Sequence, residues 1–193
     1  KGPVVVEVRT SMAFLEEMEK YGAEVYLTVG HNKAVLDKIK ETGAVFGGET
    51  TGHIYFPNEY YLYDDAIFSA LKIAQITSEK WDLAKYIDSL PRYFPSPEIF
   101  IPAPDEIKYY LIKKFQNYLR ENNYDFIDID GARINFKNGW ALARASNTSA
   151  FIKCRFEGKT KKDLLKIEDQ AIALFRKVGI ELTEENYQEL NLN

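Results

Sequence analysis

Pro91-Arg-Tyr-Phe-Pro-Ser-Pro-Glu-Ile-Phe-Ile-Pro-Ala-Pro104 is the stretch that divides this chain of 193 residues, because it holds five of the seven prolines. Proline fixes the φ angle and lacks an amide donor, so this stretch cannot be the interior of a helix or a central strand. We interpret it as a linker followed by an edge strand. The chain is therefore predicted to form two domains of nearly equal size, residues 1–94 and residues 95–193.

Before this stretch, short apolar runs alternate with helical patterns. Strands and helices are predicted in alternation at residues 4–8, 12–21, 24–28, 33–42 and 44–48. A further helix is expected after Asp64 or Asp65, either of which could cap its first turn, and it should extend to Ile76. This order predicts an α/β domain with a mostly parallel, mixed sheet.

After the proline-rich stretch the pattern changes. Apolar residues between 107 and 119 lie on one helical face, and strands are predicted around 127–129, 134–136, 140–144 and 151–156. Asp130-Gly131 and Asn138-Gly139 indicate hairpins, because type I′ turns need positive φ at both central residues. A second amphipathic helix covers residues 164–175. We predict a small α+β domain, an antiparallel sheet with flanking helices.

Composition narrows the class of protein. The net charge of −4 provides no general attraction to nucleic acid or to an anionic membrane. No apolar run approaches the ~20 residues of a membrane span, and no signal peptide is visible, so we expect a cytoplasmic protein. The single cysteine, Cys154, lies in a strand-like run and is predicted to be a core thiol. The chain opens with Lys1-Gly2-Pro3 and no Met, as a piece of a longer protein would.

Two polar loops carry the candidate chemistry. His31 and His53 each follow a glycine at the end of a predicted strand, where α/β sheets bind ligands. In Gly47-Gly48-Glu49-Thr50-Thr51-Gly52-His53, glycines permit close approach, and a carboxylate and an imidazole could grip adjacent sugar hydroxyls. A plain Gly-Gly turn with solvated polar residues is the alternative.

The second loop is Arg144-Ala-Ser146-Asn147-Thr148-Ser149, between two predicted strands. An arginine fork matches phosphate oxygens, and hydroxyls, an amide and backbone N–H groups complete an anion site. A Ser/Asn-rich turn without a ligand is the alternative, and Arg144 favours phosphate.

Together these loops resemble those of the α-D-phosphohexomutase family. Residues 48–53 resemble its Gly-Glu-x-Ser-Gly-His sugar loop, and residues 144–149 its Arg-x-Ser-Asn-Thr phosphate loop, in the same order and at similar spacing. The family has four domains, and this chain resembles the third and fourth of the phosphomannomutase/phosphoglucomutase branch.

The resemblance implies roles for individual residues. The implied sugar-binding residues are Glu49, Thr51, His53, His31 and Arg9. The implied ligands of the phosphate that is not being transferred are Arg144, Ser146, Asn147 and Thr148, with Ser149 in the same loop. Arg9 stands where the branch usually has Lys, Thr51 replaces Ser, and Ala150 stands where Pro is common.

The resemblance also implies a reaction. A phosphoserine donates to a hexose phosphate, hexose 1,6-bisphosphate forms as intermediate and activator, and Mg²⁺ stabilises the transfer between hexose 1-phosphate and hexose 6-phosphate. The family's phosphoserine loop and its Asp-Gly-Asp-x-Asp-Arg metal loop do not occur in these 193 residues, and Asp128-Ile-Asp130-Gly131 is interpreted as a turn. We therefore expect the chain to bind a phosphosugar, to lack catalytic residues and activity alone, and to work with N-terminal domains of the same polypeptide.

Three alternatives stay open. The parent protein could act on glucosamine phosphate, although His31 stands where that branch more often has Asp. The chain could instead be a stand-alone phosphosugar-binding or regulatory protein without catalysis. It could also be a structural or assembly module that kept the motifs without using them.

Overall fold

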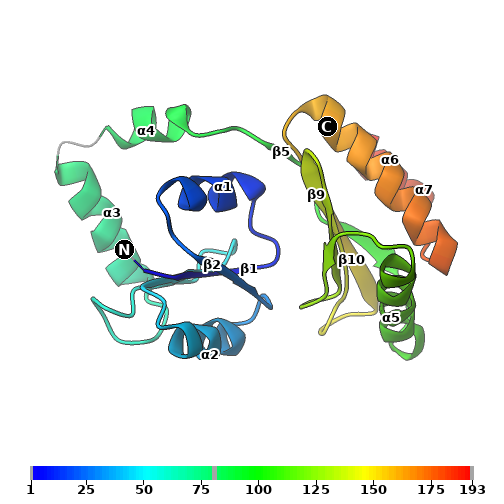
Figure 1. The fold of residues 1–193 in the computed structure, drawn as a ribbon, viewed down its shortest axis with the longest axis horizontal. Helices are drawn as coiled ribbons and strands as arrows, with labels where there is room; N and C mark the ends of the chain where they lie inside the picture. Colours follow the sequence, from blue (N-terminus) through cyan, green and yellow to red (C-terminus); the bar gives the residue numbers. More distant parts are fainter. Residues whose placement is uncertain (1, 80–81, 192–193) are drawn as a thin grey trace. The chain divides into compact units, whose positions relative to one another are not determined.

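The computed structural model describes residues 2–79 and 82–191 and divides into two units, residues 1–92 and residues 93–193 (Figure 1). Each unit has its own sheet and its own hydrophobic core. The predicted boundary, after residue 94, lies two residues further along the chain than this division. Over the part of the chain that the structure describes, no helix combines the length and the apolarity that crossing a membrane requires.

Unit 1 is a mixed α/β layer structure. Its elements are β1 (Val4–Glu7), α1 (Met12–Lys20), β2 (Val25–Thr28), α2 (Asn32–Thr42), β3 (Phe46–Gly48), β4 (Ile54–Tyr55), α3 (Ala66–Ser78) and α4 (Leu83–Ser89). The sheet order is β2-β1-β3-β4, with β1 parallel to both neighbours and β4 antiparallel to β3. Helices α1 and α2 lie on opposite faces of this sheet (Figure 1). The predicted mostly parallel, mixed sheet is confirmed, and α4 is an element that the sequence pattern did not predict.

Local signals explain where these elements begin and end. All of β1 is buried, in keeping with a central strand covered on both faces. The Ser11 hydroxyl caps α1 by accepting from the Ala13 amide at 3.1 Å. Gly43 ends α2 with a φ of 65°, a left-handed conformation in which glycine has no steric cost. Val35 and Ile39 then pack α2 onto the sheet.

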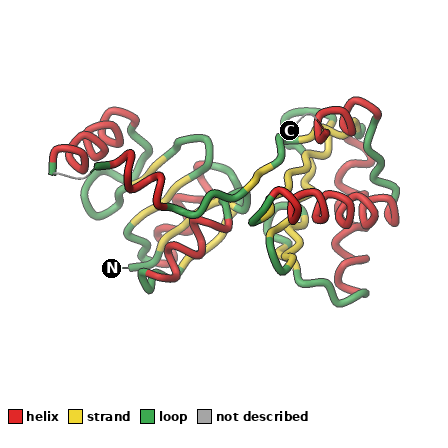
Figure 2. Tube along the Cα trace, turned by 90° about the horizontal axis from the view of Figure 1, so that it is seen from above, coloured by secondary structure: helices red, strands yellow, loops and turns green. Residues whose placement is uncertain are grey.

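Unit 2 is an antiparallel sheet with helices. Its elements are β5 (Phe94–Pro95), β6 (Ile99–Pro102), α5 (Asp105–Glu121), β7 (Phe126–Ile127), β8 (Ala132–Phe136), β9 (Gly139–Ala145), β10 (Phe151–Gly158), α6 (Lys161–Val178) and α7 (Glu184–Asn191). Both β5 and β6 pair with β10, which is followed by β9, β8 and β7. Helices α5 and α6 lie side by side against the sheet (Figures 1 and 2). This confirms the predicted α+β class, and two of the prolines, Pro95 and Pro102, lie on the edge strands β5 and β6.

The core of unit 2 is rich in aromatic side chains. Phe115 from α5 and Phe175 from α6 meet edge to face at 5.2 Å between ring centroids, and Phe156 of β10 packs beside them. Cys154 is fully buried in the same core, and this burial raises the pKa of its thiol. The prediction of a core thiol is confirmed.

The two hairpins form, but their predicted turn type is wrong. Gly131 has a φ of 77°, whereas Asn123 is the non-glycine residue with positive φ among those described, so Asp130 and Asn138 do not adopt type I′ angles. Gly139 lies inside β9, opposite Phe136, rather than in the turn. A Cβ at this position would collide with the Glu157 carbonyl of β10, so close strand packing requires the glycine.

Candidate functional site

In unit 1, the predicted sugar-binding residues gather at one edge of the sheet. Arg9 follows the end of β1, His31 follows β2, and the loop from Glu49 to His53 follows β3. Because β1 is parallel to both β2 and β3, the carboxyl ends of these three strands meet at the same edge. That edge is where open α/β sheets bind their ligands.

The loop after β3 is a closed turn held by its own backbone hydrogen bonds. The Glu49 amide donates to the His53 carbonyl at 2.9 Å, and the Gly52 amide donates to the Glu49 carbonyl at 3.0 Å. Gly52 has a φ of 92° with open space around it, so the turn itself demands glycine. Thr51 and His53 are exposed at the tip of this loop.

The pKa of Glu49 is affected by several charged groups at this edge of the sheet. Partial burial, and then the nearby Glu7 carboxylate, raise the pKa of Glu49, while His53, Arg9 and His31 act in the opposite direction. These charges therefore lie close enough to influence one another. Among the described residues, the buried Oε1 atom of Glu49 has no hydrogen-bond partner. A carboxylate oxygen without a partner can accept a hydrogen bond from a hydroxyl group of a ligand.

Two carboxylates hold the basic side chains of this edge, and the sequence pattern missed both roles. Glu7, fully buried at the end of β1, accepts from Arg9 Nε at 2.6 Å. Asp64 lies 2.5 Å from His53 Nδ1 and accepts from the side-chain Nδ2 of Asn32 at 3.1 Å. The cap of α3 is its neighbour Asp65, which accepts from the Phe68 amide. Asp64 is thus free of the capping role and orients the imidazole of the loop.

His31 has a local structural role as well as its place at the edge. Its Nδ1 atom accepts from the Lys33 amide at 3.2 Å and caps α2. The structure therefore places the ring at a helix N-terminus, with Nδ1 occupied and the ring exposed. In this arrangement Nε2 is the ring atom that remains for a ligand.

Replacing Asp64 with Asn should lower the pKa of His53. The hydrogen bond from Asp64 and its charge raise the pKa of His53 in the native chain, so removing the charge favours the neutral ring. If protonated His53 donates to a sugar phosphate, binding weakens as pH rises through this pKa, and in Asp64→Asn it weakens at lower pH. NMR titration of the ring and binding measured against pH test both statements.

Comparing the native chain with Asp64→Asn separates the titration of His53 from that of the ligand, because the ligand titrates in the same way with both proteins. Asp37→Asn is the matched control, since Asp37 pairs with Lys33 on the exposed surface of α2. An unchanged His53 pKa in Asp64→Asn would contradict the assigned contact.

In unit 2, the predicted phosphate loop connects β9 to β10. The Ser146 amide donates to the Phe151 carbonyl at 2.9 Å, and the Phe151 amide donates to the Ser149 carbonyl at 2.9 Å. The hydroxyls of Ser146 and Ser149 lie 2.8 Å apart and bond to each other. Asn147 and Thr148 are exposed at the tip. The two serines thus shape the loop, and the Ser146 hydroxyl also accepts from the Thr148 amide at 3.4 Å, while the tip residues Asn147 and Thr148 are exposed.

Arg144 lies at the base of this loop and is largely buried. One of its terminal nitrogens donates to Asp130 at 3.1 Å, and its buried Nε atom has no partner among the described residues. Asp128, the other acidic residue of the predicted turn, accepts from Arg120 at 3.0 Å instead. Asp130 therefore orients the arginine. From sequence, Asp130 is interpreted only as part of an Asp-Gly turn. Within the described residues, no three His, Cys, Asp or Glu side chains cluster as a metal would require.

A buried cation supports the phosphate loop from below. Lys108 of α5 is only 2% exposed; its ammonium group donates to Asp105 at 2.6 Å and to the Ser149 carbonyl at 2.9 Å. The neighbouring Tyr109 hydroxyl donates to Asn147 Oδ1 at 3.4 Å. This helix thus fixes both the end and the tip of the loop and adds positive charge beside it. The helical pattern of the sequence gave no signal for this contact.

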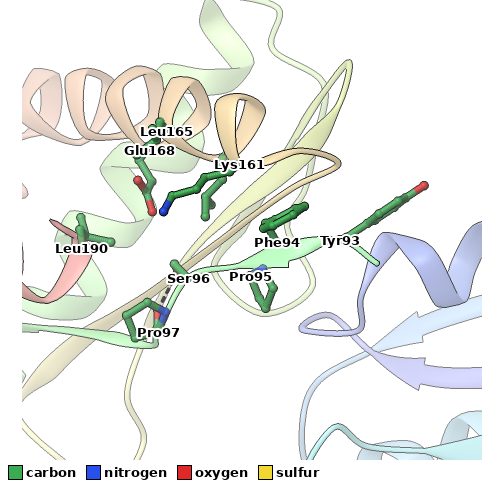
Figure 3. A pocket seen from close by; sticks show the side chains of 10 residues that line it. Tyr93, Phe94, Pro95, Ser96, Pro97, Lys161, Leu165, Glu168 and Leu190 are labelled. Carbon is green, nitrogen blue, oxygen red and sulfur yellow. Dashed lines mark hydrogen bonds between the residues drawn. The ribbon is translucent and has the colours of Figure 1, made fainter. Parts of the chain in front are cut away.

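A separate pocket of about 330 Å³ lies at the other end of the same sheet (Figure 3). Strand β5, which lines it, pairs with Glu157 and Gly158 at the end of β10 remote from the phosphate loop. Burial, followed by the charge of Asp169, raises the pKa of Glu168 in its wall to about 7. None of the predicted site residues lines this pocket.

Comparison with known proteins gives two matches to family models. The model described as "Phosphoglucomutase/phosphomannomutase, alpha/beta/alpha domain III" matches residues 1–94. The model described as "Phosphoglucomutase/phosphomannomutase, C-terminal domain" matches residues 98–174.

Individual relatives agree with these matches. A phosphomannomutase/phosphoglucomutase of Pseudomonas putida is 30% identical over 167 residues, 86% of this chain and 36% of the relative. A probable phosphoglucosamine mutase of Methanopyrus kandleri is 29% identical over 186 residues, 95% of this chain and 41% of the relative. The chain thus spans little more than a third of the length of such curated relatives.

Solved structures agree in fold. A phosphoglucomutase/phosphomannomutase family protein from Burkholderia thailandensis superposes with a TM-score of 0.84 at 24% identity, over 93% of this chain and 39% of that chain. An Aspergillus fumigatus N-acetylphosphoglucosamine mutase, solved with GlcNAc-6P and magnesium, has a TM-score of 0.64 at 15% identity, over 93% of this chain and 39% of that one.

Proposed function

This chain belongs to the phosphoglucomutase/phosphomannomutase family, and on that premise we propose that it is the substrate-binding part of a phosphohexomutase. In this proposal the whole enzyme interconverts hexose 1-phosphate and hexose 6-phosphate of mannose or glucose through a bisphosphorylated intermediate. The present 193 residues bind the substrate, and N-terminal domains of the same polypeptide supply the phosphoserine.

The observation that carries the proposal is the gathering of Arg9, His31 and the loop Glu49–His53 at the carboxyl edge of one parallel sheet. The basic side chains of Arg9, His31 and His53, together with the Glu49 carboxylate and its unpartnered oxygen, can bind adjacent hydroxyls of a hexose. A hexose offers both donors and acceptors, so a site of mixed character fits it better than it fits a simple anion.

Unit 2 supports the phosphate half of the proposal. Arg144 is held in place by Asp130, and the loop that follows it exposes Asn147 and Thr148. Such a loop can hold the phosphate that is not transferred, and phosphoryl transfer depends strongly on such positioning. The described residues offer no carboxylate cluster that fits Mg²⁺, so we assign the metal to no residue of this chain.

Titration of the chain with glucose 1-phosphate, mannose 1-phosphate and inorganic phosphate tests the proposal. We expect saturable binding of the hexose phosphates, with inorganic phosphate weaker because it lacks the sugar hydroxyls. The chain by itself should turn over none of them. Failure of all three ligands to bind at millimolar concentration would favour a structural or assembly module and contradict the proposal.

A second substrate class is glucosamine phosphate. Phosphoglucosamine mutases are among the relatives, for example that of Methanococcus maripaludis at 30% identity over 183 residues. An amino group at the sugar would carry positive charge, and the cationic Arg9 and the His31 ring at this edge favour a neutral hydroxyl instead. A preference for glucosamine 6-phosphate over glucose 6-phosphate would reverse this assignment.

Binding without catalysis is a further candidate. A phosphosugar-binding or regulatory protein would use the same two loops and would show the same affinities in the titration. Joining the chain to the N-terminal domains of a family enzyme distinguishes the two, because only a mutase half should restore turnover.

A further inference from the structure

We propose that Glu7 is the positioning residue that fixes Arg9 and the sugar loop relative to each other, so that both meet one substrate. The inference rests on the proposed function. Glu7 itself is 0% exposed and does not need to touch a ligand. Its two carboxylate oxygens serve two different segments of the site.

The first oxygen fixes the arginine. Glu7 Oε2 accepts from Arg9 Nε at 2.6 Å, and the side chain of Arg9 is 13% exposed. Nε is the inner nitrogen of the guanidinium, so this bond sets the direction in which the rest of the group points. Gly30 packs directly over the pair, since a Cβ there would collide with Glu7 Oε2 and lie 3.2 Å from Arg9 Nη2. The residue before His31 thus leaves room for the ion pair.

The second oxygen fixes the sugar loop. Glu7 Oε1 accepts from the Thr50 amide at 2.8 Å and from the Thr50 hydroxyl. Thr50 lies between Glu49 and Thr51, so the anchor acts in the middle of the predicted sugar-binding sequence. Three hydrogen bonds to Glu7 of β1 therefore reach the segments that follow β1 and β3, and Gly30, which follows β2, packs against the same carboxylate.

The electrostatics agree with a permanently charged anchor. Burial alone would raise the pKa of Glu7, but the hydrogen bonds from Arg9 and Thr50 outweigh it and hold the pKa below its ordinary value. A buried carboxylate that stays ionised is costly unless it is fully bonded, which favours the single arrangement observed. The same charge acts on Glu49, whose pKa it helps to raise.

Substituting Glu7 tests the inference. Glu7→Gln keeps the shape of the side chain but replaces one carboxylate oxygen with an NH₂ group, which cannot accept. That NH₂ group would face a donor of Arg9 or of Thr50, so one of the two segments loses its hydrogen bond to residue 7. We expect glucose 1-phosphate to bind about tenfold more weakly or worse, and inorganic phosphate to bind as before. The Thr50 amide should move in the ¹H–¹⁵N NMR spectrum, which also reports whether the variant is folded.

Two further variants keep the test decisive. Thr50→Val removes the hydroxyl contact from an exposed loop residue and should weaken glucose 1-phosphate binding a few-fold without unfolding the chain. Glu168→Gln is the matched control, because Glu168 is also a buried carboxylate but lies in unit 2, outside the site. It should leave glucose 1-phosphate binding unchanged.

The outcomes separate this inference from the function on which it rests. If native chain binds glucose 1-phosphate but Glu7→Gln and Thr50→Val bind it within twofold of native affinity, the positioning role is overturned and the proposed function stands. If native chain binds neither ligand, the proposed function fails and the positioning role fails with it. A selective loss of sugar-phosphate affinity with a displaced Thr50 amide supports both.

Discussion

Replacing Arg144 with Gln should weaken the binding of a hexose monophosphate to this chain by about 10- to 100-fold. Hydrogen bonds to a charged group contribute about 1.5–3 kcal/mol, and an arginine fork can make two of them with a phosphate. The buried Nε of Arg144 has no partner among the described residues, and Asp130 already fixes the direction of the guanidinium. The site is therefore organised before the anion arrives, and loss of the arginine removes its main cation.

Calorimetric titration with glucose 1-phosphate and with inorganic phosphate measures this loss, which should be similar for both ligands. Arg120→Gln is the matched control: it removes an arginine that also pairs with an aspartate of the same turn, Asp128, but on the exposed surface. Native affinity in Arg144→Gln would contradict the phosphate site. In a longer polypeptide that carries the phosphoserine loop, Arg144→Ala should slow turnover while still permitting phosphorylation of the serine.

Glu49→Gln extends the same experiment to unit 1. Its carboxylate is expected to accept from sugar hydroxyls, so this variant should weaken glucose 1-phosphate binding and leave inorganic phosphate binding unchanged. Unchanged glucose 1-phosphate affinity in Glu49→Gln would contradict the assigned sugar contact.

Much of the site edge could be predicted from sequence because it follows from the order of elements. Once strands and helices alternate, the carboxyl ends of parallel strands must share an edge, and Arg9, His31 and Glu49 each follow such an end. The same reasoning separated the two units, since proline is excluded from helix interiors and central strands. Both predictions depend on local sequence rules, and the structure agrees with both.

The carboxylates that hold the site could not be predicted, because each had a sufficient local explanation. Glu7 continued a strand pattern, Asp64 competed with Asp65 as a helix cap, and Asp130 belonged to an Asp-Gly turn. Their partners lie two to 43 residues away, and only the tertiary structure decides which donor each one meets. Lys108 is a similar case, since helical periodicity cannot reveal that its ammonium reaches the Ser149 carbonyl.

The missed elements have equally physical causes. Helix α7 (Glu184–Asn191) is short and strongly polar, so its apolar periodicity is weak, yet Leu190 is buried in the core of unit 2. The turn types failed because the glycines were assigned to turn centres. Gly139 is needed for strand packing against β10, and Gly131 for its approach to β9.

Replacing Gly131 with Ala should destabilise unit 2 by about 3 kcal/mol or more. Its φ of 77° costs an L-residue about 1–2 kcal/mol, and the new Cβ would meet the Ala143 carbonyl and lie 2.7 Å from both Cα and Cβ of Arg144. The first two are backbone atoms of β9 and the Cβ is attached directly to that backbone, so no side-chain rotation relieves the overlap. The melting temperature should fall by roughly 10–25 °C for a unit of this size.

Gly179→Ala is the control that separates backbone strain from collision. Gly179 ends α6 with a φ of 88°, but the nearest side-chain atom to a new Cβ is Leu111 Cδ2 at 3.9 Å, an ordinary contact. It should therefore cost only about 1 kcal/mol. Urea unfolding followed through the amide signals of β9 and β10 gives both values. Because the collision at Gly131 displaces the backbone of Arg144, Gly131→Ala should also weaken phosphate binding, which Gly179→Ala should not. Equal losses of stability in the two variants, with equal phosphate affinity, would mean that the Asp130-Gly131 turn does not hold the arginine in place.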